Sequence, residues 1–188
     1  MVASAAPPGP LEQSLLLADV AETERFGRAL GEHLRAFAAA GLTVALEGDL
    51  GAGKTTLVRA LARGLGLAPR TPLPSPTFTI AQRVELPGGL ELWHVDAYRL
   101  GGAHELEAAG LEDMCGQGRI TCVEWAGRVA DALPPDRLEI HLIPTASPRA
   151  PTAPGEPPVG RRLRLRALGA QSRVALATLP WPAEPAPR

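Results

Sequence analysis

Residues Leu42–Thr56 read LTVALEGDLGAGKTT, and the rest of the chain can be placed around them. The first five, as far as Leu46, are almost all apolar, which predicts a buried strand of a parallel sheet. The next residues match the phosphate-binding pattern G-x-x-x-x-G-K-S/T from Gly48 to Thr55. Apolar residues then recur at helical spacing until Gly64 and Gly66, which predict the end of a helix. Strand, glycine-rich turn and helix are the context in which this pattern holds a nucleotide.

Each residue type in the glycine-rich turn has a physical role. Its glycines leave space for backbone N–H groups to converge on phosphate oxygens, and the helix N-terminus adds further N–H donors. Lys54 is expected between the β- and γ-phosphates, and the Thr55 hydroxyl on Mg²⁺. Lys54 is the only lysine beside eighteen arginines, so a compact ammonium occurs only where the pattern requires it. The expected nucleotide-binding residues here are Asp49, Leu50, Gly51, Ala52, Gly53, Lys54, Thr55 and Thr56.

Composition restricts the class of protein. A chain of 188 residues suffices for one α/β domain. The formal net charge of −1 gives no broad cationic surface, so we do not expect DNA as a partner. Cys115 and Cys122 form no metal-binding pattern, and we expect buried thiols in a reducing cytosol. We also see no signal peptide and no apolar run long enough for a bilayer, so we expect a cytoplasmic protein without a membrane partner.

Helical and strand patterns alternate along the rest of the chain. A helix capped by Asp19 or Thr23 is expected to end near Gly41. After the phosphate-binding helix comes a proline-rich loop, 69–76, and then two alternating runs separated by residues 87–89, which predict an antiparallel hairpin. The remaining expected elements are a helix over 103–115 broken at Gly110, a buried strand over 120–123, a helix over 126–133, and strands at 138–142 and 163–167.

These patterns predict an α/β protein with a three-layer P-loop NTPase-like fold, in which a mostly parallel sheet carries additional antiparallel hairpin strands. Residues 1–10 and 180–188 are expected to be a disordered start and a loose tail on either side of one domain, 11–179. Residues 144–160, inside the last hairpin, are rich in proline and alanine and are expected to form a long flexible loop.

Four arginines lie at the start of the last predicted strand, namely Arg161, Arg162, Arg164 and Arg166. We place them near its outward face, where charged side chains protect an edge strand from aggregation. Contact with RNA is the alternative interpretation of the same residues.

The sequence also narrows the choice of nucleotide and of acidic residues. Guanine recognition in P-loop GTPases uses a second lysine in an Asn/Thr-Lys-x-Asp motif, which this chain cannot contain, so ATP is favoured. Asp96 and Glu124 each end a predicted strand, where a carboxylate can hold Mg²⁺ or its waters, and at least one of them is expected to be functional. Thr77, in the loop before the hairpin, is a candidate switch residue that senses the γ-phosphate, or else an ordinary start of a strand.

Five motifs, in this order and spacing, resemble the TsaE family: Gly48–Thr56, Ser75–Phe78 (SPTF), His94–Arg99 (HVDAYR), Gly110–Asp113 (GLED) and Val123–Trp125 (VEW). TsaE proteins are bacterial ATPases of tRNA threonylcarbamoyladenosine biosynthesis. The resemblance, which runs from about Asp19 to Leu142, implies action with a complex of the TsaB and TsaD proteins and only indirect contact with tRNA.

The resemblance also implies roles for single residues. Thr55 and Glu124 would be the Mg²⁺ ligands, and Asp96 would support hydrolysis. Trp125 would sit beside the site, and Val20, with the preceding aspartate, would border the adenine. The expected catalytic set is therefore Asp96, Glu124 and Thr77, with ATP and Mg²⁺ as cofactors. Pro74, before the SPTF motif, and the segment 144–160 depart from the family pattern, so we expect a stiffer loop at the first and leave the role of the second open.

Two other functions fit a P-loop. A small-molecule kinase needs a lid that supplies Arg or Lys to the transferred phosphoryl group. The arginines Arg83, Arg99, Arg119 and Arg128 could serve, but no Arg-rich lid segment stands out. A nucleotide-gated binding module with little turnover is the second alternative, and it overlaps with the family interpretation.

Overall fold

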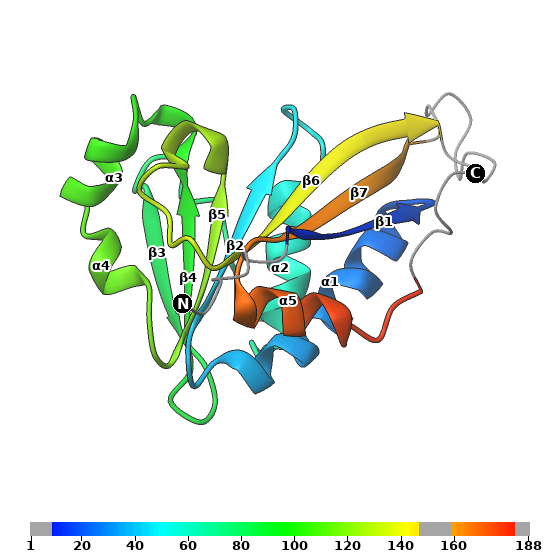
Figure 1. Cartoon of the computed structure of the whole chain (residues 1–188), viewed down its shortest axis with the longest axis horizontal. Helices are drawn as coiled ribbons and strands as arrows, with labels where there is room; N and C mark the ends of the chain where they lie inside the picture. Colours follow the sequence, from blue (N-terminus) through cyan, green and yellow to red (C-terminus); the bar gives the residue numbers. More distant parts are fainter. Residues whose placement is uncertain (1–8, 147–158, 183–188) are drawn as a thin grey trace, which may run out of the picture.

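The fold, taken from a computed structural model that describes residues 9–146 and 159–182, is built on a single seven-stranded sheet. The strand order is β1-β7-β6-β2-β5-β4-β3, which places β2 at the centre (Figure 1). The strands are β1 (Leu11–Leu17), β2 (Leu42–Glu47), β3 (Ala81–Glu85), β4 (Glu91–Asp96), β5 (Arg119–Glu124), β6 (Arg137–Ala146) and β7 (Val159–Ala167).

The sheet is mixed. β2 runs parallel to both β5 and β6, and β4 runs parallel to β5. The pairs β1–β7, β6–β7 and β3–β4 are antiparallel. The predicted α/β class is confirmed, although the parallel pairings make up half of the sheet rather than most of it. Three parallel strands, β2, β5 and β4, end at the same edge, and this is where a P-loop fold gathers its functional residues.

Helices cover both faces of the sheet. α1 (Val20–Leu34), α2 (Lys54–Gly64) and α5 (Ala170–Ala177) share a core with Val44 and Leu46 of β2. α3 (Ala103–Ala108) and α4 (Leu111–Met114) lie on the opposite face, in a second core that contains Ala45. This alternation along β2 follows from the period of two in a strand, and it makes β2 buried on both faces. Three single turns, η1 (Arg35–Phe37), η2 (Ala97–Arg99) and η3 (Ala126–Val129), complete the regular structure.

Two glycines hold α2 close behind the phosphate-binding turn. A Cβ atom at Gly31 of α1 would lie 2.1 Å from the carbonyl oxygen of Leu61, and one at Gly64 would lie 2.1 Å from that of Arg28. Only glycine permits this approach of the two backbones, so α1 supports α2 directly. The predicted start of α1 and the predicted end of α2 are confirmed, with the Asp19 side chain capping α1 through the Glu22 N–H at 2.7 Å. The end of α1 is not, because α1 stops at Leu34 and passes into the single turn η1 instead of continuing to near Gly41.

Three further elements differ from the prediction. β1 and α5 were not expected, and the helix predicted over 126–133 is reduced to the single turn η3. β1 exists because it pairs along its whole length with β7, some 150 positions away in the sequence, as Leu11↔Ala167 to Leu17↔Arg161. Such a partner is invisible to local periodicity.

The last hairpin is longer than predicted. Pro144 pairs with Arg161 and Thr145 with Gly160, so the ends of the expected flexible loop are ladder residues. Residues 147–158, with 1–8 and 183–188, lie outside the described residues, and the domain limits remain a prediction. Trp181, which we assigned to the loose tail, packs edge-on against Phe26, with ring centroids 5.3 Å apart. No helix in the described part of the chain is long and apolar enough to cross a membrane.

Candidate functional site

The phosphate-binding turn joins the end of β2 to the start of α2. Its glycines have left-handed backbones where the motif needs them, with φ of +80° at Gly51 and +103° at Gly53. Residues with a side chain rarely adopt these angles, so glycine fixes the course of the turn. The turn is closed by a hydrogen bond from the Ala52 N–H to the Asp49 carbonyl at 3.1 Å, and α2 begins at Lys54.

The Lys54 ammonium is held inside this turn. Nζ donates to the carbonyl oxygens of Gly48 at 2.5 Å and Asp49 at 3.0 Å, and it lies 3.7 Å from the centroid of the Trp125 ring. Lys54 is only 5% exposed. Burial lowers its pKa below the usual value, and the carboxylate of Glu124 is the largest opposing influence. The ammonium is therefore a desolvated cation whose direct hydrogen-bond partners are neutral carbonyl oxygens, for which a charged phosphate would be a stronger replacement.

The two acidic residues stand side by side at the ends of adjacent parallel strands. Asp96 of β4 pairs with Glu124 of β5 in the sheet register. Glu124 accepts a hydrogen bond from the Thr55 hydroxyl at 2.9 Å on Oε2, and its Oε1 lies 2.7 Å from Nε2 of His94. Both His94 and Glu124 are buried. Glu124 is thus hydrogen-bonded to Thr55, the residue that the sequence predicts as a metal ligand.

Asp96 has different partners. Its Oδ2 accepts hydrogen bonds from Ser75 at 2.8 Å and Thr77 at 2.6 Å, and its Oδ1 accepts one from the Tyr98 N–H at 3.1 Å. Ser75 and Thr77 belong to the SPTF motif, so the carboxylate ties the proline-rich loop to the end of β4. The structure therefore separates the two acids, with one on Thr55 and the other on the loop.

Trp125 follows Glu124 in a conformation that is unusual for a bulky residue. Its φ is +59°, and the next turn is held by the Glu47 carboxylate, which accepts from the Gly127 N–H. The indole ring lies over Lys54 and 5.0 Å from the Tyr98 ring. Outliers of this kind cluster at functional sites, because the surrounding structure must hold them in place.

These residues surround one cavity of about 430 Å³. Its lining consists of Leu50, Gly51, Gly53, Lys54, Thr55, Thr56, Ser75, Thr77, Asp96, Tyr98, Glu124, Trp125 and Arg161. Nine of the predicted site residues are therefore brought together. Of the other three, Asp49 and Ala52 lie in the turn itself and give their carbonyl oxygens to Lys54 and Arg161. Val20 lines a separate groove of about 670 Å³ along α1 and α2, which shares Thr56 with the cavity.

Arg161 corrects a prediction. We placed it with Arg162, Arg164 and Arg166 on the outward face, but Arg161 is 6% exposed and reaches the cavity, whereas the other three are exposed. Because β7 begins at Val159 and not near Leu163, position 161 lies within the strand and on the same face as the core residues Leu163 and Leu165. Extending the alternation of the strand backwards by two residues from the buried Leu163 would have predicted that Arg161 is buried. His94 and Ser75 stood in quoted motifs but had no predicted role.

The donor set suits Mg²⁺. Thr55 offers a hydroxyl oxygen and Glu124 a carboxylate, and the second carboxylate, Asp96, is adjacent in the sheet. The described residues contain no group of three or more His, Cys, Asp or Glu that could enclose a metal ion on their own. Mg²⁺ is usually bound by one or two carboxylates together with water and substrate phosphates, so these residues fit it.

A glycine-rich turn between a central strand and a helix, with a buried lysine and a threonine–carboxylate pair, defines a P-loop α/β protein. The profile described as "Threonylcarbamoyl adenosine biosynthesis protein TsaE" matches residues 17–150. The chain therefore belongs to the TsaE family, and the predicted resemblance is confirmed.

Individual relatives agree with this assignment. The protein named "tRNA threonylcarbamoyladenosine biosynthesis protein TsaE" of Bacillus subtilis is 43% identical over 116 residues, which cover 61% of this chain and 70% of the relative. The protein of the same name from Streptomyces coelicolor is 44% identical over 117 residues, covering 61% and 77%. The crystal structure of B. subtilis YdiB superposes with a TM-score of 0.65 at 28% identity, over 92% of this chain and 96% of the other.

Proposed function

We propose that this chain binds ATP with Mg²⁺ and hydrolyses it slowly, in support of threonylcarbamoylation of the tRNA adenosine next to the anticodon, together with a TsaB–TsaD-like complex. The observation that carries the proposal is the 2.9 Å hydrogen bond between Thr55 and Glu124, next to the buried Lys54 ammonium in the P-loop cavity. ATP is favoured over GTP because the chain has no second lysine for a guanine motif.

The residues of the chain divide the work between binding and hydrolysis. The amides of the turn and Lys54 bind the phosphates, and Thr55 and Glu124 would hold the metal ion. Mg²⁺ supplies positive charge to the β- and γ-phosphate oxygens when bound. His94 orients the carboxylate of Glu124 from the side away from Thr55. Trp125 shields the ammonium from water, and Tyr98 packs against the Trp125 ring.

Asp96 and Thr77 are proposed to serve hydrolysis, and their contacts explain a slow rate. Asp96 already accepts three hydrogen bonds from the protein. Two come from the hydroxyls of Ser75 and Thr77, and the third comes from the Tyr98 N–H. These three hydrogen bonds take up most of the roughly four acceptor positions of the carboxylate, so little capacity is left to orient an attacking water. Thr77 must leave Asp96 before it can reach a γ-phosphate, so turnover depends on a movement of the SPTF loop.

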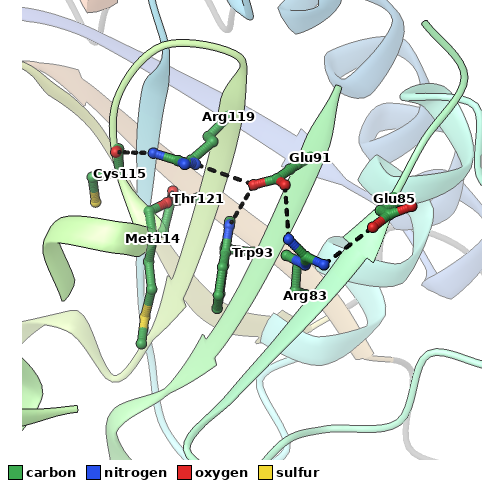
Figure 2. Close-up of polar contacts among 8 residues, drawn as sticks. All are labelled: Arg83, Glu85, Glu91, Trp93, Met114, Cys115, Arg119 and Thr121. Carbon is green, nitrogen blue, oxygen red and sulfur yellow. Dashed lines mark hydrogen bonds and ion pairs between the residues drawn. The ribbon is translucent and has the colours of Figure 1, made fainter. Parts of the chain in front are cut away.

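The kinase alternative loses two of its four candidate lid arginines. Figure 2 shows Arg83 and Arg119, two of the four candidate lid arginines, both bound to Glu91 at 3.1 Å. Glu91 is the first residue of β4 and Asp96 the last, so the residue that both arginines bind lies about 16 Å along the strand from the cavity end. They form a polar ladder with Glu85 and Trp93 that ties the hairpin to β5.

Calorimetric titration with ATP and GTP, in Mg²⁺ and in EDTA, tests the nucleotide part of the proposal. We expect ATP to bind much more tightly than GTP. The Lys54→Ala protein should bind ATP much more weakly than the parent, and so should the Lys54→Arg protein. A planar guanidinium does not fit where Nζ lies within 3.0 Å of two carbonyl oxygens and 3.7 Å of an indole centroid. Equal affinities for ATP and GTP, or a Lys54→Arg protein with the affinity of the parent, would contradict this assignment.

The roles of the two acids are separable in the same assay. Glu124→Ala should lose mainly the Mg²⁺-dependent part of nucleotide affinity, whereas Asp96→Ala should keep binding and release phosphate more slowly. Asp131→Ala, which removes an exposed carboxylate outside the cavity, is the matched control. A phosphorylated metabolite in place of free phosphate would identify a kinase.

The tRNA part is tested in a bacterium depleted of its own TsaE protein. Expression of this chain should restore threonylcarbamoyladenosine, measured by mass spectrometry of tRNA nucleosides, and Lys54→Ala should not. Restoration by the Lys54→Ala protein would show that nucleotide binding is not required, and it would overturn the proposal.

A further inference from the structure

The groove between α1 and α2 is lined by more positive than negative charge. It has a volume of about 670 Å³ and meets the P-loop cavity at Thr56, which lines both. Its three arginines come from two helices, Arg28 from α1 and Arg59 and Arg63 from α2, and its lining contains one carboxylate, that of Glu24. The lining also includes apolar residues, namely Val20, Ala60, Leu67, Ala68 and Pro69. The groove is therefore a cationic surface with an apolar component.

The two arginines of α2 are held in place without being neutralised. Arg59 donates from Nε to the carbonyl oxygen of Leu73 at 2.8 Å. Arg63 donates to the carbonyl oxygens of Ala68 and Thr71, the latter at 2.6 Å. Carbonyl oxygens carry no net charge, and within residues 9–146 and 159–182 neither arginine has an ion-pair partner. The backbone thus orients both guanidinium groups and leaves their charge for an anionic ligand.

The third arginine has only a weak partner in the groove. The Arg28 guanidinium lies 3.5 Å from the carboxylate of Glu24, one helical turn away, and both side chains are about half exposed. An exposed pair of this kind contributes at most about 1 kcal/mol, so Glu24 does not hold the guanidinium firmly. The arginines also outnumber the glutamate, which leaves an excess of positive charge. Charge complementarity therefore favours a ligand with several negative charges.

The surroundings of the groove favour a protein segment over a nucleic acid. A nucleic-acid backbone continues on both sides of any one contact, so it binds to an extended basic surface. Here α1 also carries Glu22 and Glu32, and the formal net charge of the chain is −1, so a long polyanion would meet like charge beside the groove. A short acidic segment confines its charge to the groove, and its apolar side chains can pack on Val20 and Pro69. Arginine clusters commonly recognise acidic motifs in this way.

We propose that the groove between α1 and α2 binds an acidic segment of a partner protein, with Arg28, Arg59 and Arg63 contacting its carboxylates. Because the groove meets the P-loop cavity at Thr56, the bound segment would lie next to the nucleotide site. No residue of the SPTF motif lines the groove. The inference goes beyond the proposed function, since it requires neither a bound nucleotide nor hydrolysis.

Fluorescence anisotropy of a labelled peptide tests this inference on the full chain without nucleotide. The peptide is short and contains only glutamate and leucine, and its control has glutamine in place of every glutamate. We expect the parent to bind the first peptide and not the second, and to bind it more weakly as the salt concentration rises. Arg28→Glu should lower the affinity by about tenfold or more. Arg25→Glu, the same charge reversal on α1 but outside the groove lining, should change the affinity little.

Arg59→Gln separates loss of charge from loss of folding. The glutamine amide nitrogen is as many bonds from the backbone as Nε of arginine, so it can still donate to the Leu73 carbonyl. The melting temperature should therefore stay near that of the parent, while the affinity for the glutamate peptide falls several-fold. If the parent did not bind this peptide, or if Arg25→Glu weakened binding as much as Arg28→Glu, the proposal would be wrong.

Bulk tRNA is titrated in the same way to test the alternative occupant. We expect the groove variants to leave any binding of tRNA unchanged. If the parent bound tRNA but not the peptide, and Arg28→Glu abolished that binding, the groove would be an RNA site and the acidic segment would be excluded. ATP affinity is measured separately, so a failure of peptide binding leaves the proposed function intact, and a failure of ATP binding leaves this inference intact.

Discussion

At the residue scale, His94 is the least expected member of the site. It is fully buried, its Nε2 lies 2.7 Å from Glu124 Oε1, and Nδ1 has no hydrogen-bond partner among the described residues. A carboxylate is an acceptor, so we assign the proton to Nε2. This bond fixes one oxygen of Glu124 and leaves Oε2 facing Thr55. His94 is therefore placed to position Glu124, the proposed metal ligand, as partners of metal ligands commonly do.

We expect His94→Leu to weaken Mg²⁺-dependent nucleotide binding by about tenfold or more, with a much smaller effect in EDTA. His94→Gln, which keeps an N–H donor near the position of Nε2, should recover most of this loss. The readout is the ratio of ADP affinities with and without Mg²⁺. An equal loss in both conditions would indicate that His94 has only a packing role.

The same scale separates what the sequence could and could not predict of the site. The turn, Lys54, Thr55 and both acids were predictable because each is fixed by a local pattern or by the end of a strand. The division of roles between the acids was expected from the family resemblance, but the hydrogen bonds from Ser75 and Thr77 to Asp96 were not, because they depend on the position of the SPTF loop. Arg161 was misplaced because its orientation depends on where β7 begins.

At the element scale, α5 shows why some structure escapes local patterns. Its N-terminal glycine, Gly169, has no side chain to cap the helix. Asp136, before β6, takes that role across the fold, accepting from the N–H groups of Gln171 at 2.8 Å and Ser172 at 3.0 Å. The helix start is therefore encoded 35 positions away from it. β1 is a similar case, since it needs β7 as its partner.

Asp136 gives a pH-dependent prediction. Burial alone would raise its pKa, but the hydrogen bonds from Ser172 and Gln171 outweigh burial and lower the pKa below the ordinary 3.8. The carboxylate therefore stabilises the fold above that ordinary value, and this contribution is lost as the pH falls through the lower pKa of the folded state.

We expect Asp136→Asn to cost roughly 1 kcal/mol in urea unfolding at pH 7, and the difference from the parent to shrink below about pH 4. Asp131→Asn, at an exposed site, should change little at either pH. An Asp136→Asn penalty of the same size at pH 7 and pH 3 would mean that the charge is not responsible.

At the scale of the whole molecule, large apolar side chains are exposed on the segments that surround the cavity. Leu50 of the turn is 84% exposed and Phe78 of the SPTF loop is 83% exposed, with the Arg99 guanidinium 4.2 Å from the Phe78 ring centroid. Tyr98 is also exposed beside them. Exposed apolar groups around a cavity are typical of surfaces that meet another protein. The same loop binds Asp96 through Ser75 and Thr77, so a partner that docked on Phe78 would contact the segment that holds Asp96.

This connection leads to the last prediction. We expect the isolated chain to hydrolyse ATP slowly, and a TsaB–TsaD-like complex to raise its turnover at least several-fold by drawing the SPTF loop away from Asp96. By linkage, a partner that prefers the ATP-bound state must tighten ATP binding by the factor by which ATP tightens partner binding. Phosphate release and ATP affinity are measured with and without the complex.

Phe78→Ser should keep the ATP affinity of the isolated chain but lose the stimulation, whereas Val174→Ser, at an exposed position on α5, should keep both. Fast turnover by the chain alone, with no response of either quantity to the complex, would mean that the engaged Asp96 does not limit hydrolysis.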